Sequence, residues 1–112
     1  MKIISTPISI SELKAIARES FGDMVKAVVD LKKESMAIGG ELHADEEAAL
    51  LAAGSAQADL WGINIYPDQQ RGKWLEFDSM INIRPSQQNR SRTVENAALR
   101  KKITEIVNKL IA

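Results

Sequence analysis

Apolar and polar residues alternate in two long stretches of this chain, as they do in strands that have one buried face. The first stretch covers residues 24–42. If Leu31 pairs with Met36, the apolar side chains of both strands share one face. The same pairing sets Lys26 opposite Glu41 on the other face, where opposite charges attract. We therefore predict a hairpin over residues 24–42 in this register.

The second stretch, residues 60–84, repeats the pattern with a longer connection between its strands. Its polar row includes Asn64, Glu76, Asp78, Asn82 and Arg84, which alternate with an apolar row of Trp61, Ile63, Ile65, Leu75, Phe77, Ile81 and Ile83. Trp61 belongs to the apolar row and is expected in the core, whereas Trp74 falls on the polar side as a candidate exposed contact residue. This pattern predicts a second hairpin over residues 60–84.

Three segments follow a helical period instead. Ser9 and Glu12 have the spacing of a capping box and begin a helix over residues 10–21. Asp45 is placed to cap a second helix, which ends near residue 53. The last helix covers residues 94–111, and its apolar stripe comprises Leu99, Ile103, Ile106, Val107 and Leu110.

The predicted order of elements is α-ββ-α-ββ-α, which indicates an α+β fold. We expect both hairpins to form one four-stranded, mainly antiparallel sheet, with the three helices packed on its apolar face. A chain of 112 residues has the length of a single domain, residues 1–112. The polar rows of both hairpins would then share one open face, and the loop at residues 85–93 would leave from its end.

Composition narrows the functions that the chain can perform. The net charge is zero, with 15 basic and 15 acidic residues, which argues against a polybasic nucleic-acid binder. The chain has no cysteine, which excludes disulfides, thiol catalysis and cysteine-ligated metal sites and is typical of a reducing cytoplasm. Neither a membrane-spanning stretch nor a signal-peptide pattern is present. We therefore expect a cytoplasmic protein with no membrane partner.

The loop after Pro85 is dense in hydrogen-bonding side chains. Guanidinium groups bind phosphate or carboxylate in a bidentate manner, and carboxamides add further donors. The candidate ligand-binding residues are therefore Asn64, Asn82, Arg84, Gln87, Asn89, Arg90 and Arg92. An alternative is that Arg84, Arg90 and Arg92 pair with carboxylates of the polar face and thereby order the loop.

His43 is the only histidine, and a carboxylate beside an imidazole is a fragment of general acid–base sites. The candidate catalytic residues are His43 with Glu41 or Asp78 as its acidic partner. The alternative is that His43 makes only a structural hydrogen bond near the start of the second helix. A zinc site lacks further histidines, and a magnesium site from Glu41, Asp45, Glu76 and Asp78 is a further alternative, so no metal ligand is assigned. The glycine-rich motifs of nucleotide-binding proteins are absent, so no cofactor is assigned either.

Three motifs resemble those of a small bacterial and archaeal family of uncharacterised proteins. They are GGELHAD at 39–45, LWGINIYP at 60–67 and FDSMINIRPSQQNRSR at 77–92, and the likeness extends from about Val25 to the C-terminal helix. The family carries no established activity. The resemblance implies that the polar residues of these motifs form one constellation, namely Glu41, His43, Asp45, Asn64, Asp78, Asn82, Arg84, Asn89, Arg90 and Arg92. Gln88 stands where the resemblance implies a glycine, which argues against a glycine-dependent turn there.

Three functions fit these observations. The first is a non-enzymatic domain whose polar sheet face and arginine-rich loop bind an anionic partner, either a phosphate-containing small molecule or RNA. The second is a small hydrolase, such as a phosphodiesterase, that uses His43 with an acidic partner while the arginines stabilise developing charge. The third is a homo-oligomer that assembles through its sheet edge or its polar face. The position of His43 relative to the arginines distinguishes these hypotheses.

Overall fold

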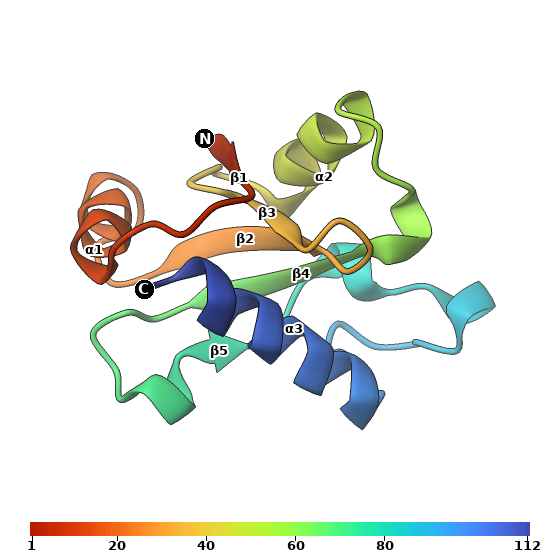
Figure 1. Cartoon of the computed structure of the whole chain (residues 1–112). Coiled ribbons are helices and arrows are strands. Elements are labelled where there is room, and N and C mark those ends of the chain that lie inside the picture. Colours follow the sequence, from red (N-terminus) through yellow and green to blue (C-terminus); the bar gives the residue numbers. More distant parts are fainter.

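Five strands form one antiparallel sheet, whose edge-to-edge order is β1-β3-β2-β4-β5 (Figure 1). The computed structural model describes all residues of the chain, 1–112. The strands are β1 (Lys2–Ile4), β2 (Val25–Asp30), β3 (Ser35–Ile38), β4 (Leu60–Ile65) and β5 (Leu75–Glu76), and the helices are α1 (Ile10–Glu19), α2 (His43–Ala52) and α3 (Ala97–Leu110). The predicted α+β class and the three helices are confirmed.

The predicted number of four strands is wrong, because the N-terminal segment forms a fifth. β1 pairs antiparallel with β3 and occupies one edge of the sheet. The opposite edge is β5, which has only two residues and pairs with the end of β4 through Asn64 opposite Glu76 and Ile65 opposite Leu75.

The chain leaves the sheet after β5 instead of continuing as a strand to Arg84. Ser79 Oγ accepts a hydrogen bond from the N–H of Ile81 and begins a short 3-10 turn at Met80–Asn82. The side chain of Asn82 then takes the place of a strand partner, because it bonds the N–H and the C=O of Gly62 at 2.9 and 3.0 Å. The alternating polar row at residues 76–84 is therefore not one face of a strand.

The first predicted hairpin forms, but its register differs by two residues from the prediction. Val29 lies opposite Met36, and Asp30 lies opposite Ser35. The turn begins one residue earlier than predicted, because Asp30 Oδ1 accepts hydrogen bonds from the two N–H groups that follow Leu31, each at 2.9 Å. β3 ends at Ile38, so Glu41 does not lie opposite Lys26.

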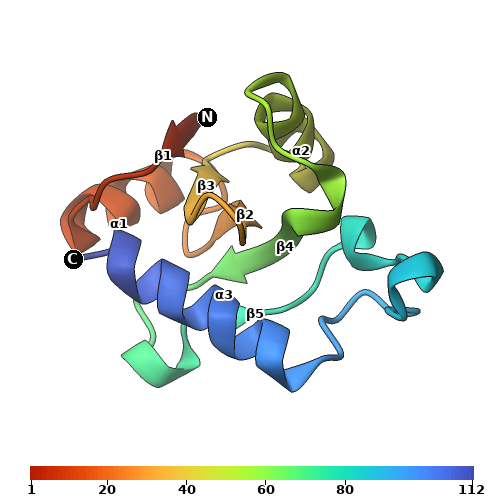
Figure 2. The same cartoon turned by 45° about the vertical axis from the view of Figure 1, so that its right-hand side comes forward.

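Helices cover both faces of the sheet, as Figures 1 and 2 show from two directions. α1 and α3 pack on one face through a core that includes Leu13, Ile63 and Ile106. α2 packs on the other face, where Leu50 contacts Val28 and its neighbours Ala37 and Leu60. The prediction that all three helices share one face and leave an open polar face is therefore wrong.

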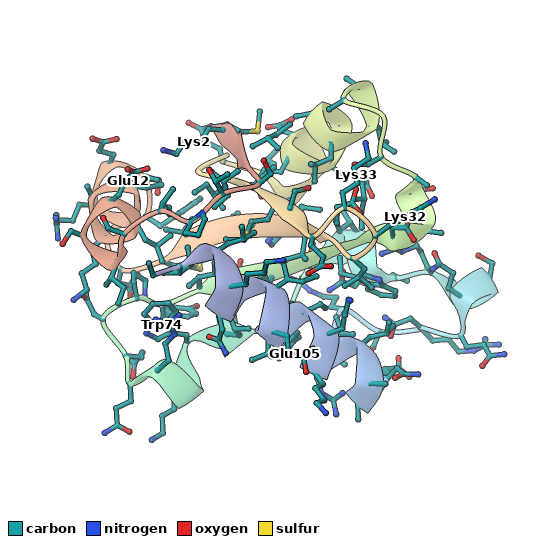
Figure 3. The ribbon with its side chains drawn as sticks, viewed as in Figure 1. Lys2, Glu12, Lys32, Lys33, Trp74 and Glu105 are labelled. Carbon is teal, nitrogen blue, oxygen red and sulfur yellow. The ribbon has the colours of Figure 1, made fainter.

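The two tryptophans are both buried. Trp61 is 1% exposed and lies in the core as predicted, whereas the prediction of an exposed Trp74 is wrong, because its side chain is only 4% exposed. Trp74 Nε1 donates to the carbonyl of Gln69 at 2.8 Å, and the guanidinium of Arg71 lies 4.1 Å from its ring centre. Figure 3 shows Trp74 beneath the sheet, beside the C-terminal end of α3.

The helix ends follow local hydrogen bonding. Ser9 caps α1 by accepting from the N–H of Glu12, as predicted. Asp45 does not cap α2: this helix begins at His43 without a side-chain cap, so Asp45 lies inside its first turn. Asn96 caps α3, which therefore begins at Ala97, three residues after the predicted start.

The position of α3 leads to a test of the core. Ile103 and Ile106 are fully buried, so replacement of either with alanine should leave a cavity and lower the free energy of unfolding by about 2–5 kcal/mol. Urea denaturation measures this loss. Lys102→Ala, an exposed position on the same helix, should change the free energy by less than about 0.5 kcal/mol. Losses that small at both isoleucines would contradict the packing of α3.

Candidate functional site

His43 lies at the start of α2 and points toward the sheet. Its Nε2 lies 2.8 Å from the carbonyl oxygen of Ile63. A carbonyl only accepts hydrogen bonds, so Nε2 carries the hydrogen and Nδ1 keeps its lone pair in the neutral ring. Burial lowers the pKa of His43, and Lys26 and Arg92 lower it further, against the opposing effects of the Ile63 hydrogen bond and of Asp78. At neutral pH the ring is therefore uncharged, with Nδ1 free to accept a hydrogen bond or a proton.

A small pocket of about 180 Å³ opens beside His43, and we refer to it as the His43 pocket. Its polar side chains are Lys26, His43, Ser79 and Arg92, and its apolar rim includes Leu42 and Met80. Both rim residues are exposed, at 57% and 64%. The pocket thus lies where α2, β2 and the segment after β5 meet.

The two cations of the His43 pocket differ in their partners. Arg92 forms a bidentate ion pair with Asp78, with Nε–Oδ1 at 2.7 Å and Nη2–Oδ2 at 3.3 Å. Lys26 is half-buried and forms no ion pair, and its Nζ lies 5.5 Å from the ring centre of Phe21. The pocket therefore contains one positive charge, that of Lys26, which forms no ion pair with a carboxylate of the chain.

Arg84, a candidate ligand-binding residue, is used by the fold. Its guanidinium stacks 4.1 Å from the ring centre of Trp61 and donates to the carbonyl oxygens of Gln57 and Leu60. It also donates to the side chain of Gln87, which itself donates to the carbonyl of Ala58 at 3.0 Å. Arg84 and Gln87 thus fasten the loop to the segment before β4 and do not line the His43 pocket.

Buried carboxamides order the loop. Asn89 is 3% exposed, and its Nδ2 donates to the carbonyl oxygens of Asn82, Ser91 and Thr93 at 2.7–3.1 Å. The expectation that three arginines order this loop by pairing with carboxylates holds only for Arg92. Arg84 bonds carbonyls, and the side chain of Arg90 makes no hydrogen bond or ion pair.

Gln88 adopts the left-handed conformation, with φ of 60°. The chain therefore makes the left-handed turn that a glycine would favour, but with a glutamine at this position. The N–H of Gln88 donates to the carbonyl of Pro85 at 3.0 Å, and the bridge between Arg84 and Asn89 closes the turn on both sides. These bonds offset the strain that a side chain causes at positive φ.

The remaining candidates lie apart from the His43 pocket. Asn64 lies opposite Lys26 in the sheet, and its Nδ2 donates to Glu76 Oε1 at 2.8 Å and to the carbonyl of Asp78 at 3.3 Å. Glu41 is exposed and lines a neighbouring pocket rather than touching His43. Of the three candidate catalytic residues, only His43 lines the pocket, while Asp78 contacts it through Arg92.

The sequence interpretation did not assign Lys26 or Ser79 to the site. Lys26 carried a usable signal, because its position in the first alternating strand places it on the face opposite the apolar core. Ser79 interrupts the apolar row between Phe77 and Ile81, which indicates an irregular strand, but its place in the pocket depends on the turn that follows it.

Glu46 is a second buried group that was not anticipated. Its side chain is fully buried beneath α2, where Oε2 accepts from the N–H of Gly40 at 2.9 Å and Oε1 has no partner. Burial raises the pKa of Glu46 to about 8. A signal was present in the sequence, since His43, Glu46 and Leu50 follow the i, i+3, i+7 spacing of one helix face.

Glu46 makes stability depend on pH. The folded protein binds the Glu46 proton more tightly than the unfolded chain, so the contribution of Glu46 to stability is fully present below the ordinary carboxyl pKa of 4.5 and is lost as pH rises toward about 8. Glu46→Gln removes this titration. Urea denaturation from pH 5 to pH 8, within the range bounded by those two pKa values, should show a falling free energy of unfolding for the natural protein relative to the variant. Parallel curves for the two proteins would contradict a protonated, buried Glu46.

The loop offers a matched pair of substitutions. Asn89→Ala leaves three carbonyl groups without their donor and should destabilise the protein by about 2–4 kcal/mol. Arg90→Ala removes an exposed side chain without a partner and should change the free energy of unfolding by less than about 0.5 kcal/mol. Thermal denaturation of both variants measures the contrast, and a larger loss for Arg90→Ala would show that the arginine orders the loop.

The chain belongs to the family DUF5674, described as a protein of unknown function, whose family model matches residues 2–110. This match confirms the resemblance to a family of uncharacterised proteins. Comparison with curated proteins and with solved structures finds no match. No helix combines the length and the apolar composition that a membrane span requires. No group of three or more histidine, aspartate and glutamate side chains is placed to hold a metal ion.

Proposed function

We propose that the His43 pocket binds a small anionic group, such as the phosphate of a phosphate-containing ligand. The observation that carries this proposal is Lys26, a half-buried cation that lacks a carboxylate partner and faces the same pocket as Arg92 and His43. The carbon chain of a half-buried lysine packs along the protein surface while its ammonium group stays accessible to a ligand. A bound anion would supply the missing partner.

The neighbouring groups support an anion and not a cation. Arg92 engages Asp78 through Nε and Nη2, which leaves Nη1 as a donor toward a ligand. The pocket is lined by two cations, Lys26 and Arg92, and only one carboxylate, that of Asp78, pairs with them. The net charge of these three groups is therefore positive. An oxyanion would accept from Lys26 and Arg92, and charge-assisted hydrogen bonds of this kind are the stronger ones in proteins.

The size of the pocket limits what it holds. Its volume of about 180 Å³ lies below the roughly 300–1,000 Å³ of sites that enclose a drug-sized ligand. The pocket therefore suits a single anionic group, and the remainder of a larger ligand would extend outside it across the apolar rim.

A second candidate function is hydrolysis of a phosphate ester, with His43 as the general base. The observation that favours it is the orientation of the imidazole: the Ile63 carbonyl holds Nε2–H, so the basic Nδ1 is the nitrogen left for a substrate or a water. Burial keeps the pKa of His43 low, so the ring is unprotonated at neutral pH, as a general base requires. Lys26 and Arg92 would stabilise negative charge that develops in the transition state.

Titration with sulfate, monitored by amide chemical shifts, tests anion binding, because sulfate does not change its charge near neutral pH. Lys26→Gln and Arg92→Gln should each weaken binding about tenfold or more, since each removes a charge-assisted hydrogen bond. The matched control is Arg90→Gln, which removes an exposed arginine outside the pocket and should leave affinity unchanged. Affinity should also fall with rising salt. Equal losses of sulfate affinity in all three variants would show that binding depends only on the net charge of the protein, and this result would overturn the proposal.

Replacement of His43 with glutamine separates the two candidate functions. Above neutral pH, where His43 is uncharged, a binding protein should keep most of its sulfate affinity, whereas a hydrolase should keep affinity and lose roughly 10²–10⁴-fold in the rate of bis(p-nitrophenyl) phosphate cleavage. Absence of any cleavage by the natural protein above the uncatalysed rate would remove the hydrolase hypothesis for this substrate. Titration with short RNA in the same assay shows whether the anion is part of a polymer.

A further inference from the structure

A second pocket adjoins the His43 pocket, and we refer to it as the Glu41 pocket. It has a volume of about 430 Å³ and is lined by Glu19, Ser20, Phe21, Gly39, Glu41 and Leu42. Leu42 belongs to both pockets. Lys26 also links them, because it lines the His43 pocket and its Nζ lies 5.5 Å from the ring centre of Phe21. The two hollows therefore adjoin at Leu42, and we refer to them together as the groove.

The charges of this groove are separated along its length. The His43 end carries Lys26 and Arg92, whereas the Glu41 pocket carries the carboxylates of Glu19 and Glu41. Neither carboxylate forms an ion pair or a hydrogen bond within the chain. The groove is thus basic at one end and acidic at the other, with an apolar middle.

Glu19 is in an unfavourable place without a cation. It is the last residue of α1, where the helix dipole presents its negative end and a carboxylate is repelled. Arg18, the basic residue of the same turn, forms no ion pair with it. Phe21 adds a 42% exposed ring to the same pocket, and Lys26 Nζ lies 5.5 Å from the centre of that ring. The helix end and the two carboxylates favour a positively charged group in the Glu41 pocket.

We infer that the ligand of this groove is an amine-bearing phosphate, with the phosphate between Lys26 and Arg92 and the ammonium group in the Glu41 pocket. This inference rests on the proposed function and adds the class of ligand. A phosphate ester whose remainder is neutral would leave Glu19 and Glu41 without a cation, whereas an amine would supply one. The apolar carbon chain between the two charged groups would lie across Leu42.

A series of ω-aminoalkyl phosphates from ethyl to hexyl tests the inference, with the alkyl phosphate of equal length as the control for each. Amide chemical shifts report binding. The amine should tighten binding roughly fivefold at the chain length that spans Leu42, and by less at shorter lengths, since each exposed charge contact contributes little. The amides of residues 19–21 and 39–42 should shift only with the amine-bearing series.

Two variants separate the ends of the groove. Glu41→Gln should reduce the fivefold advantage of the amine and leave the affinity for the simple alkyl phosphate unchanged. Lys26→Gln should weaken both series about equally. If alkyl phosphates bind and the amine adds nothing at any length, the inference is overturned while the proposed function stands. If no phosphate of either series shifts the His43 pocket, both are overturned.

Discussion

The hydrogen bonds between the side chain of Asn82 and the backbone of Gly62 determine where the candidate site can form. β4 pairs with β2 along one edge, but β5 covers only the end of its other edge. Asn82 supplies the missing donor and acceptor at Gly62, and it also donates to the carbonyl of Arg92 at 3.0 Å. One carboxamide therefore joins the sheet to both ends of the loop. Gly62 is required for this arrangement, because a Cβ there would lie 2.6 Å from the side chain of Ser79.

The sheet face under α2 is more polar than the face under α1 and α3. The face under α1 and α3 is filled by aliphatic and aromatic side chains, whereas the face under α2 holds Glu46, Asn64 and His43 beside a cluster of only four buried apolar residues. Two of these polar groups are incompletely bonded, since Glu46 Oε1 and Asn64 Oδ1 have no partner. Buried polar atoms without partners reduce stability. Buried titratable groups whose pKa is perturbed, such as Glu46 and His43, are often found at functional sites.

The sequence predicted the elements better than the contacts between them. Periodicity identified α1, β2, β4 and α3, because each has a strong apolar pattern that packing does not override. The register of the first hairpin was wrong because Asp30 begins the turn with its own side chain, which an apolar pattern cannot indicate. Within the site, His43 and Arg92 were identified by residue type. The internal use of Arg84 and Asn89 was not, because their partners are carbonyl groups, which every residue possesses and no sequence pattern marks.

The geometry of the pocket couples anion binding to the protonation of His43. Burial first, and then the positive charges of Lys26 and Arg92, hold the pKa of His43 below its ordinary value. In the proposed complex an anion would neutralise part of that positive charge and would accept a hydrogen bond from a protonated Nδ1. Binding would therefore raise the pKa of His43, and by linkage a falling pH would strengthen binding. The anion-binding and hydrolase hypotheses require opposite protonation states of His43. A binding protein gains from a protonated ring, whereas a general base requires that the ring stay neutral with the ligand in place. The single hydrogen bond to Ile63, which leaves Nδ1 facing the ligand, serves either function. The charge of His43 when the anion is bound therefore distinguishes a binding protein from a hydrolase.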